Sequence, residues 1–377
     1  MAAVKLLFLV NPGWFFESHR LPLALAAKEA GYEVHLALPG DPVTEAVTEA
    51  GFNIHVIPMT RQGASLKSEI RSLWEIYKLY KKIRPEIVHH VTIKPVLYGS
   101  LVARLLKIPA VVNAFSGLGH VFIAKGWKAG IRRFLISFGY KVAFKHPNCI
   151  GIVQNLDDER VLQSYNVLTS AQTVLIKGSG VDLSKYDVVP EPEGKPVVTL
   201  ASRLIAEKGI NEFIAAARIV KGARFMLVGD VDEGNPSALR EDEIRQWEKL
   251  GLIDWLGFSK DINSTFKNSS IVVLPSYREG LPKVLIEALA CGRPIVTTDT
   301  AGCREMIDFN DPNGILVPVK DVIDLAGSIQ KLVNDREKRV SMGLSGRKWA
   351  EKNFAIETVL ADTLDVYTKL VDHEAKL

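Results

Sequence analysis

The sequence alternates short, nearly continuous apolar runs with helical stretches along its whole length, and this alternation constrains the fold more than any other feature. The first half contains the apolar runs 4–10, 34–38, 54–57, 87–90, 110–113, 150–153 and 174–176, and the second half contains 197–201, 225–228, 253–256, 271–274, 295–298 and 315–317. Apolar strands that are each followed by a helix are typical of parallel sheets covered on both faces. We therefore predict an α/β chain with two doubly wound, Rossmann-like sheets.

A segment with three prolines and several charges, residues 187–196, separates the two sets of strands. A chain of 377 residues has the length of two ordinary domains. We expect one domain over residues 1–187 and a second over residues 188–354. Open α/β sheets bind ligands at the carboxyl ends of their strands, so joining two of them predicts a central cleft with a ligand.

Basic residues are concentrated in one part of the first half. Between residues 61 and 145 the sequence has 16 Lys and Arg against three acids. Residues 125–146 form a helical pattern whose apolar face, including Trp127, is flanked by Lys128, Arg132 and Arg133. This pattern is typical of a helix that lies on an anionic membrane surface. Nucleic acid is the alternative partner, but no nucleic-acid recognition motif is present, so we expect none.

Two glutamates eight residues apart, Glu279 and Glu287, follow the expected strand 271–274. Gly280 lets the backbone approach a ligand closely, and the start of the next helix offers N–H groups to a sugar hydroxyl or an anion. Acids at a helix start are also favoured by the helix dipole without any function, but this accounts for Glu279 better than for Glu287.

Two cations, Arg203 and Lys208, follow the expected strand 197–201 and precede a helix that begins near Gly209. Cations beside a helix N-terminus at the carboxyl end of a strand form an anion site suited to a diphosphate. The motif Asp230-Val231-Asp232 could instead bind Mn²⁺ or Mg²⁺. Because the cationic pair already neutralises a diphosphate, we expect no catalytic metal and no cofactor.

Together these motifs resemble the retaining glycosyltransferases of family 4, which join two such domains in the GT-B arrangement. Segments that resemble the bacterial branch of this family are 14–22, 116–119, 154–158 and 178–182. That branch builds capsule, O-antigen and other lipid-linked oligosaccharides. Within it the chain is similar to enzymes that add N-acetylgalactosamine or a related sugar to an undecaprenyl-diphosphate-linked sugar.

The resemblance implies a role for each motif residue. Arg203 and Lys208 would hold the diphosphate of a UDP-sugar donor, and Glu279 would contact hydroxyls of the transferred sugar. Glu287 would accept hydrogen bonds from the ribose. Further donor contacts would come from Ser202, Gly280, Leu281, Pro282 and Gly13. The family's acceptor hydroxyl is thought to attack on the face that the diphosphate leaves, without a protein nucleophile.

The first domain would bind the acceptor, a lipid-linked saccharide, and the last helices, about 355–377, would pack back on it. Candidate acceptor-side residues are His19, Arg20, Lys94 and His120. The sequence departs from the family in two places. Gly13 stands alone where the first loop often has two glycines, and Ser116 stands where many relatives have a histidine.

Two other functions remain open at this point. One is a nucleotide-sugar epimerase on the same fold, and the other is a protein that binds nucleotide-sugars without turnover. Cys149, Cys291 and Cys303 lack metal-ligand spacing, which predicts reduced thiols. We expect a cytoplasmic protein attached peripherally to the inner face of the cell membrane.

Overall fold

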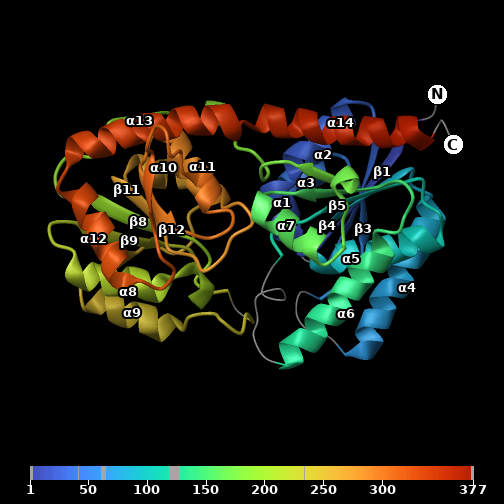
Figure 1. Cartoon of the computed structure of the whole chain (residues 1–377), viewed down its shortest axis with the longest axis horizontal. Coiled ribbons are helices and arrows are strands. Elements are labelled where there is room, and N and C mark those ends of the chain that lie inside the picture. The colour runs from blue at the N-terminus through green and yellow to red at the C-terminus, as the bar shows by residue number, and fades with distance from the viewer. Residues whose placement is uncertain (1–2, 41, 61–64, 119–126, 233, 375–377) are drawn as a thin grey trace. The chain divides into compact units, whose positions relative to one another are not determined.

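The computed structural model describes residues 3–40, 42–60, 65–118, 127–232 and 234–374 (Figure 1). The chain divides into unit 1, which runs to Ser179 and resumes at Val359, and unit 2, Gly180–Thr358. The chain thus passes between the units twice. The sequence analysis placed the first passage at 187/188 and expected the helices from about residue 355 to pack back on the first domain. The first passage lies earlier because Val181 already pairs with unit 2: its N–H donates to the oxygen of Phe354 (2.9 Å), and its oxygen accepts from Ile356 (3.1 Å).

Unit 1 contains a seven-stranded parallel sheet in the order β3-β2-β1-β4-β5-β6-β7. Its strands are β1 (Lys5–Val10), β2 (Glu33–Leu38), β3 (Asn53–Val56), β4 (Ile87–Val91), β5 (Ala110–Ala114), β6 (Cys149–Val153) and β7 (Thr173–Leu175). Each begins within one residue of its predicted start. The apolar runs were therefore sufficient to locate all the strands of this sheet.

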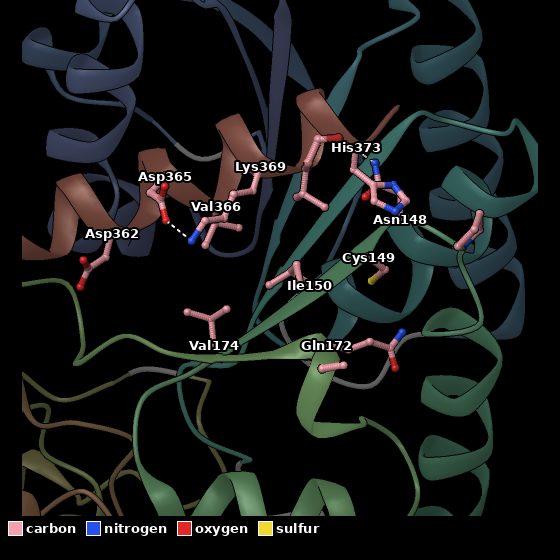
Figure 2. Close-up of a pocket in the computed structure, with 13 residues that line it drawn as sticks. Asn148, Cys149, Ile150, Gln172, Val174, Asp362, Asp365, Val366, Lys369 and His373 are labelled. Atoms are coloured by element: carbon pink, nitrogen blue, oxygen red, sulfur yellow. Dashed lines mark hydrogen bonds and ion pairs between the residues drawn. The ribbon is translucent and has the colours of Figure 1, made fainter. Parts of the chain in front are cut away.

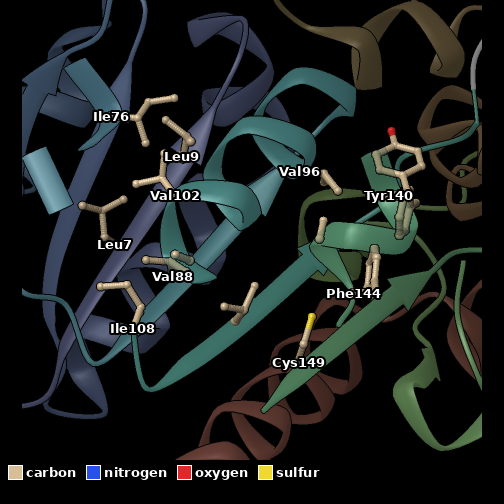
Figure 3. Packing of buried hydrophobic residues seen from close by; sticks show 14 of the residues in the cluster. Leu7, Leu9, Ile76, Val88, Val96, Val102, Ile108, Tyr140, Phe144 and Cys149 are labelled. Atoms are coloured by element: carbon tan, nitrogen blue, oxygen red, sulfur yellow. The ribbon is translucent and has the colours of Figure 1, made fainter. Parts of the chain in front are cut away.

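Helices cover both faces of this sheet. They are α1 (Gly13–His19), α2 (Leu21–Glu29), α3 (Glu45–Glu49), α4 (Leu66–Ile83), α5 (Ile93–Leu105), α6 (Trp127–Ala143), α7 (Leu156–Ser164) and α14 (Ile356–Glu374). Alternate residues of β1 point to opposite cores. Leu7 and Leu9 pack with side chains of α4–α7 (Figure 3), and Phe8 packs with α1–α3 and the C-terminal helix α14. No helix among the described residues has the length and apolar character needed to span a membrane.

Unit 2 contains a six-stranded parallel sheet in the order β10-β9-β8-β11-β12-β13. Its strands are β8 (Val197–Ala201), β9 (Arg224–Val228), β10 (Asp254–Trp255), β11 (Ile271–Leu274), β12 (Ile295–Thr298) and β13 (Gly314–Val317). One face carries α8 (Ile210–Ile219), α9 (Glu241–Lys249) and α12 (Val322–Val333). The other carries α10 (Ile262–Lys267), α11 (Lys283–Ala290) and α13 (Arg336–Asn353).

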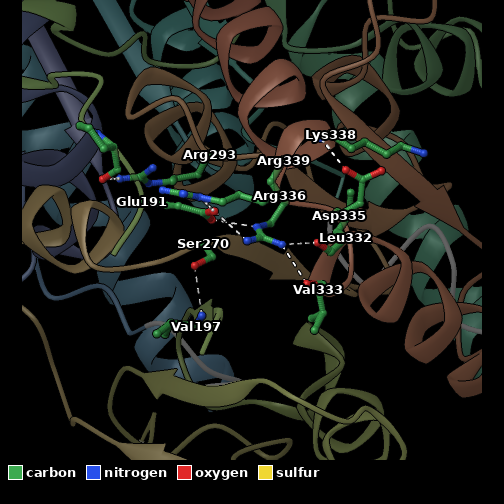
Figure 4. Close-up of polar contacts among 11 residues, drawn as sticks. Glu191, Val197, Ser270, Arg293, Leu332, Val333, Asp335, Arg336, Lys338 and Arg339 are labelled. Atoms are coloured by element: carbon green, nitrogen blue, oxygen red, sulfur yellow. Dashed lines mark hydrogen bonds and ion pairs between the residues drawn. The ribbon is translucent and has the colours of Figure 1, made fainter. Parts of the chain in front are cut away.

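The segment 187–196, expected to act as a linker, packs on unit 2 through a buried ion pair (Figure 4). Glu191 accepts from Nε and Nη2 of Arg339 at 2.8 and 2.7 Å, and both side chains are at least nine-tenths buried. Arg339 also donates to the carbonyl oxygens of Leu332 and Val333 at the end of α12. Burial alone would raise the pKa of Glu191, but the hydrogen bonds and charge of Arg339 lower it. The segment is therefore a fixed part of unit 2.

In both sheets the strand order reverses at one point, between β1 and β4 in unit 1 and between β8 and β11 in unit 2. Ligands of doubly wound sheets bind at such a reversal, beyond the carboxyl ends of the strands. The loops after these four strands are where functional side chains are expected.

Candidate functional site

The reversal point of unit 2 brings the predicted cation Lys208 against the predicted acid Glu279. Lys208 ends the short 3₁₀ helix η4 (Ala206–Lys208), which follows β8, and Glu279 lies in the loop after β11. The Lys208 Nζ lies 2.5 Å from Glu279 Oε1, which also accepts from the hydroxyl of Ser276 at 2.6 Å. Both side chains of the ion pair are less than one-fifth exposed. The ion pair therefore has a defined geometry and is largely shielded from water.

Two glycines allow this geometry. Gly209 follows Lys208 with a φ of +73°, and a Cβ there would lie 2.7 Å from the carbonyl carbon of Pro275. Gly302 has a φ of +75°, and its Cβ would lie 2.8 Å from the carbonyl oxygen of Glu279. Only glycine adopts such a backbone without cost and permits so close an approach. The backbones on both sides of the Lys208–Glu279 pair are thus held in place by close packing.

Arg203 lies on the same side of the sheet but pairs with another acid. Its Nη1 is 2.5 Å from Asp232 Oδ2, and its side chain is 40% exposed. Ser202 precedes it, donating its N–H to the oxygen of Val228 and its hydroxyl to the oxygen of Arg203. Asp232 was considered in the sequence only as a metal ligand. In the structure it orients a cation at the end of β8.

Glu287 lies in the second turn of α11, and its side chain is 11% exposed. Its Oε1 accepts from the hydroxyl of Tyr186 at 3.1 Å and lies 3.7 Å from Lys283 Nζ. Burial raises the pKa of Glu287, although the charge of Lys283 and the Tyr186 hydrogen bond act in the opposite direction. Gly280, Leu281 and Pro282 connect Glu279 to this helix and are buried.

A hollow of about 650 Å³ lies at the carboxyl ends of β9 and β10. It is lined by Asp230, Val231, Glu241, Arg245, Trp255, Leu256 and Gly257. The Trp255 indole donates to the oxygen of Gly229 at 2.9 Å, and the Arg245 guanidinium lies 4.2 Å from the ring centroid of Trp255. Because Asp230 and Val231 are next to Asp232, the hollow is adjacent to the Arg203–Asp232 pair. Its volume is within the range of ligand pockets.

In unit 1, Gly13 begins α1 directly after β1, and His19 and Arg20 lie at its other end. The His19 ring stacks on that of Phe15, with 4.1 Å between centroids. Arg20 is only 5% exposed, whereas the sequence suggested a side chain open to a cleft. Burial lowers its pKa to about 10, so it remains a cation at neutral pH.

Lys94 lies in the first turn of α5, after β4, and is bound to an acid of α4. Its Nζ is 2.7 Å from Glu69 Oε1, and Glu69 Oε2 accepts from the hydroxyl of Tyr98 at 2.7 Å. Ser116 follows β5 and is half-buried. His120, the remaining acceptor-side candidate, lies outside the described residues.

Models of two glycosyltransferase families match the chain. Residues 5–150 match "Glycosyl transferase 4-like", and residues 185–349 match "Glycosyl transferases group 1". An N,N'-diacetylbacillosaminyl-diphospho-undecaprenol alpha-1,3-N-acetylgalactosaminyltransferase of Campylobacter jejuni is 30% identical over 349 residues, which is 89% of this chain and 91% of the relative. The chain is a glycosyltransferase of group 1.

Another relative is also a glycosyltransferase by name, and two solved structures share the fold. A UDP-Gal:alpha-D-GlcNAc-diphosphoundecaprenol alpha-1,3-galactosyltransferase of Escherichia coli is 24% identical over 84% of this glycosyltransferase and 83% of its own length. Sucrose-phosphate synthase from Thermosynechococcus elongatus has a TM-score of 0.83 at 19% identity, covering 98% of this chain and all of its own. Anabaena HepE, in complex with UDP and glucose, has a TM-score of 0.77 at 18% identity, with 97% and 100% covered. The predicted GT-B fold is confirmed.

Three features of this glycosyltransferase were not predicted from its sequence. Tyr186 hydrogen-bonds to Glu287 across 101 residues of sequence, and no local pattern could have revealed it. The exposed side chains Leu66, Ile70 and Trp74 recur every four residues along α4, a spacing that could have been read from the sequence. A groove of about 550 Å³ lies between α14 and the strands β6 and β7, lined by Ile150, Val174 and Val366 among others (Figure 2). None of the predicted site residues that the structure describes lines this groove.

Proposed function

We propose that this glycosyltransferase moves a sugar, with retention of anomeric configuration and without a metal, from a UDP-sugar to an undecaprenyl-diphosphate-linked saccharide. The observation that carries the proposal is the 2.5 Å Lys208–Glu279 pair at the sheet reversal of unit 2. It places a cation for a diphosphate and a carboxylate for sugar hydroxyls side by side, where doubly wound sheets bind ligands. The transferred sugar in this proposal is N-acetylgalactosamine, N-acetylglucosamine or a related hexose.

In the proposed reaction an acceptor hydroxyl oxygen bonds to C1 of the sugar while the bond from C1 to the donor diphosphate breaks. The acceptor proton passes to the departing diphosphate oxygen. Lys208 and Arg203 stabilise the negative charge that develops on the diphosphate, and Glu279 orients the sugar through its hydroxyls. Catalysis of this kind depends on positioning and on fixed charges, which a dehydrated site makes more effective.

Glu287 would bind the ribose of the donor, with the Tyr186 hydroxyl holding its carboxylate in place. Backbone groups of Ser202, Gly280, Leu281 and Pro282 would complete the donor contacts from unit 2, and Gly13 would contribute from unit 1. The hollow beside Asp230 and Trp255 has room for a nucleoside. The choice of UDP is supported by the name of the Escherichia coli relative and by the HepE complex.

Independence from metal is supported by the state of the Asp230–Asp232 motif. Asp232 Oδ2 accepts from both Arg203 and Asn235, at 2.5 and 3.0 Å. The carboxylate is therefore engaged by protein donors, and the charge of the diphosphate is met by Arg203 and Lys208. Within the part of the chain that the structure describes, no cluster of three or more His, Cys, Asp or Glu side chains could hold a metal ion.

The acceptor would bind unit 1 through His19, Lys94 and His120, at the inner face of the cell membrane. The fourth acceptor-side candidate, Arg20, is buried and would not contact the acceptor. Attachment to an anionic surface is supported by exposed apolar side chains on two helices, Trp127, Phe134 and Phe138 on α6 and Leu66, Ile70 and Trp74 on α4. Each of these two helices packs against α5 in one layer (Figure 1). The exposed Lys67, Arg71, Lys78, Lys81 and Lys82 on α4 supply charge complementary to acidic lipids. The side chains of Lys128, Arg132 and Arg133 on α6 lie outside the part that the structure describes.

Thermal unfolding with EDTA present and with UDP, UDP-sugars, GDP-sugars or ADP-sugars added tests the donor. A ligand at a hundred times its dissociation constant stabilises by ~2.7 kcal/mol, a shift that is easily measured. We expect stabilisation by UDP and the largest shift with one UDP-sugar. A response only to GDP- or ADP-sugars would replace the donor, and no response to any nucleotide would favour a protein that has lost turnover.

The same donor and a membrane extract containing lipid-linked acceptor then test Glu279. Replacement Glu279→Ala should lower turnover far more than UDP binding, because its carboxylate would contact the sugar and not the nucleotide. Glu337→Ala, an exposed acid on α13, is the matched control. Unchanged turnover in Glu279→Ala would contradict its role, and a product of inverted anomeric configuration by NMR would contradict retention.

A further inference from the structure

Arg20 is a buried cation with no acidic partner among the residues that the structure describes. It is 5% exposed and forms no ion pair with any Asp or Glu that the structure describes. Its Nη1 donates to the carbonyl oxygen of His19 at 3.1 Å, while its Nε has no hydrogen-bond partner within the described part of the chain. The guanidinium keeps its proton at neutral pH, since burial lowers its pKa only to about 10. Buried charges are ordinarily paired, so this one requires a counter-charge.

His89 on β4 has a second buried nitrogen without a hydrogen-bond partner among the described residues, and its side chain lies near Arg20. It is 1% exposed, and its Nδ1 lies 2.5 Å from the hydroxyl of Tyr367 on α14. Burial and, to a smaller extent, the charge of Arg20 keep the pKa of His89 well below its ordinary value, so the ring is neutral. Burial also raises the pKa of Tyr367, so its hydroxyl keeps the proton and can donate to Nδ1. The ring proton then resides on Nε2, for which the described residues offer no hydrogen-bond partner.

A small cavity adjoins both residues. It has a volume of about 10 Å³ and is lined by His19, Arg20, Leu23, His89, Ala114, Ile152, Ile176, Gly178, Ser179, Val359, Leu360 and Thr363. A cavity of this size holds one particle about as large as a water molecule. A phosphate or diphosphate is therefore too large for it. The cavity also contacts both segments in which the chain leaves unit 1, next to Ser179 and Val359.

We propose that unit 1 binds a single halide-sized anion, chloride under ordinary conditions, between Arg20 Nε–H and His89 Nε2–H. A water molecule would satisfy the two N–H groups but would leave the buried charge uncompensated. An anion does both, and hydrogen bonds to a charged partner are the stronger kind. Because the occupant contacts both exit segments, its binding stabilises the points at which the chain leaves unit 1. The site is independent of the transferase reaction and needs no substrate.

The test is thermal unfolding of the full-length protein at pH 7 in sodium chloride, sodium bromide or sodium gluconate of equal ionic strength. We expect the midpoint to rise saturably with chloride and bromide, by ~2–4 °C for each 1 kcal/mol of binding energy, and not with gluconate. Arg20→Met keeps the apolar stem and should abolish the halide response. Arg160→Met, a change at a 73% exposed arginine of α7, should leave the response intact.

Crystals of the unaltered protein grown with bromide give a second measurement that does not depend on the stability of Arg20→Met. We expect an anomalous peak within hydrogen-bond distance of Arg20 Nε and His89 Nε2. Equal unfolding midpoints in chloride and gluconate would overturn the proposal, as would a peak at this position without anomalous signal, which would identify water. A bromide peak without any halide response in solution would mean binding at crystal concentration only and would also overturn it.

Discussion

Gly302→Ala tests whether the close packing behind Glu279 sets the geometry of the site. A Cβ at position 302 would lie 2.7 Å from the carbonyl carbon of Gly280 and 2.8 Å from the carbonyl oxygen of Glu279, and nearer still to the Gly280 oxygen. Ordinary contact begins at 3.4 Å, so the Glu279 backbone must retreat by at least 0.6 Å (3.4 minus 2.8 Å). A misplacement of about 1 Å at a catalytic group can lower turnover roughly 100-fold.

The matched control is Gly251→Ala. Gly251 has a φ of +68°, close to the +75° of Gly302, but a Cβ there meets nothing within 4 Å. Both changes carry the same conformational cost, ~1–2 kcal/mol for a residue other than glycine in this backbone region. They differ in whether they displace the Glu279 loop.

We expect the thermal unfolding midpoints of both variants to lie a few degrees below that of the unaltered protein. Only Gly302→Ala should lose turnover. The assay is the release of UDP from the preferred UDP-sugar in the presence of lipid-linked acceptor, with thermal unfolding measured in parallel. Equal turnover in the two variants would show that the site tolerates movement of this loop. The reasoning about Glu279 would then be wrong.

Three further changes test other parts of the structure. Glu191→Ala leaves the buried Arg339 unpaired and should destabilise unit 2 by ~3–5 kcal/mol, which lowers its unfolding midpoint by ~6–20 °C. The control is Glu193→Ala, a change at an exposed glutamate of the same segment. Equal midpoints for the two variants would contradict the role of the ion pair. Burial raises the pKa of Glu287, so its charged form lowers the free energy of unfolding. Glu287→Gln should therefore stabilise the folded protein at pH 7. This gain in stability should shrink as the pH falls through the raised pKa and vanish below pH ~4.3, where the glutamate is protonated in both the folded and the unfolded state. A gain independent of pH would show that charge is not its cause. Trp74→Glu, or joint replacement of Lys128, Arg132 and Arg133 by Glu, should release the protein from anionic vesicles in a sedimentation assay. The control Ile323→Glu, at a more exposed site on α12, should not. Unchanged binding of the first two variants would remove the membrane surface from the proposal.

The sequence was sufficient for the architecture because the fold depends on local patterns. Most strands of the sheets are apolar runs long enough to be recognised alone, although β10 has only two residues, and α-helices lie between most successive runs. The predictions for Arg203, Lys208, Glu279 and Glu287 had a similar basis, since these residues follow particular strands at short spacing.

Partners from distant parts of the chain could not be predicted in this way. Lys208 meets Glu279 across 71 residues, Tyr186 meets Glu287 across 101, and Glu191 meets Arg339 across 148. Such pairs arise only when the strands and helices are packed, because no spacing rule links side chains so far apart in sequence. The same reason explains why residues 187–196, with the composition of a linker, form part of unit 2.

The sequence by itself determined that the chain forms two parallel sheets, the order of strands and helices along the chain, and the loops that carry the candidate site. The tertiary structure decided which charges are paired and which are buried. Arg20 shows the difference: its sequence position suggested a cation open to the acceptor, but the packing of α1 and α14 encloses it. Periodicity and spacing are properties of neighbouring residues, whereas burial and pairing depend on elements that meet only in the folded chain.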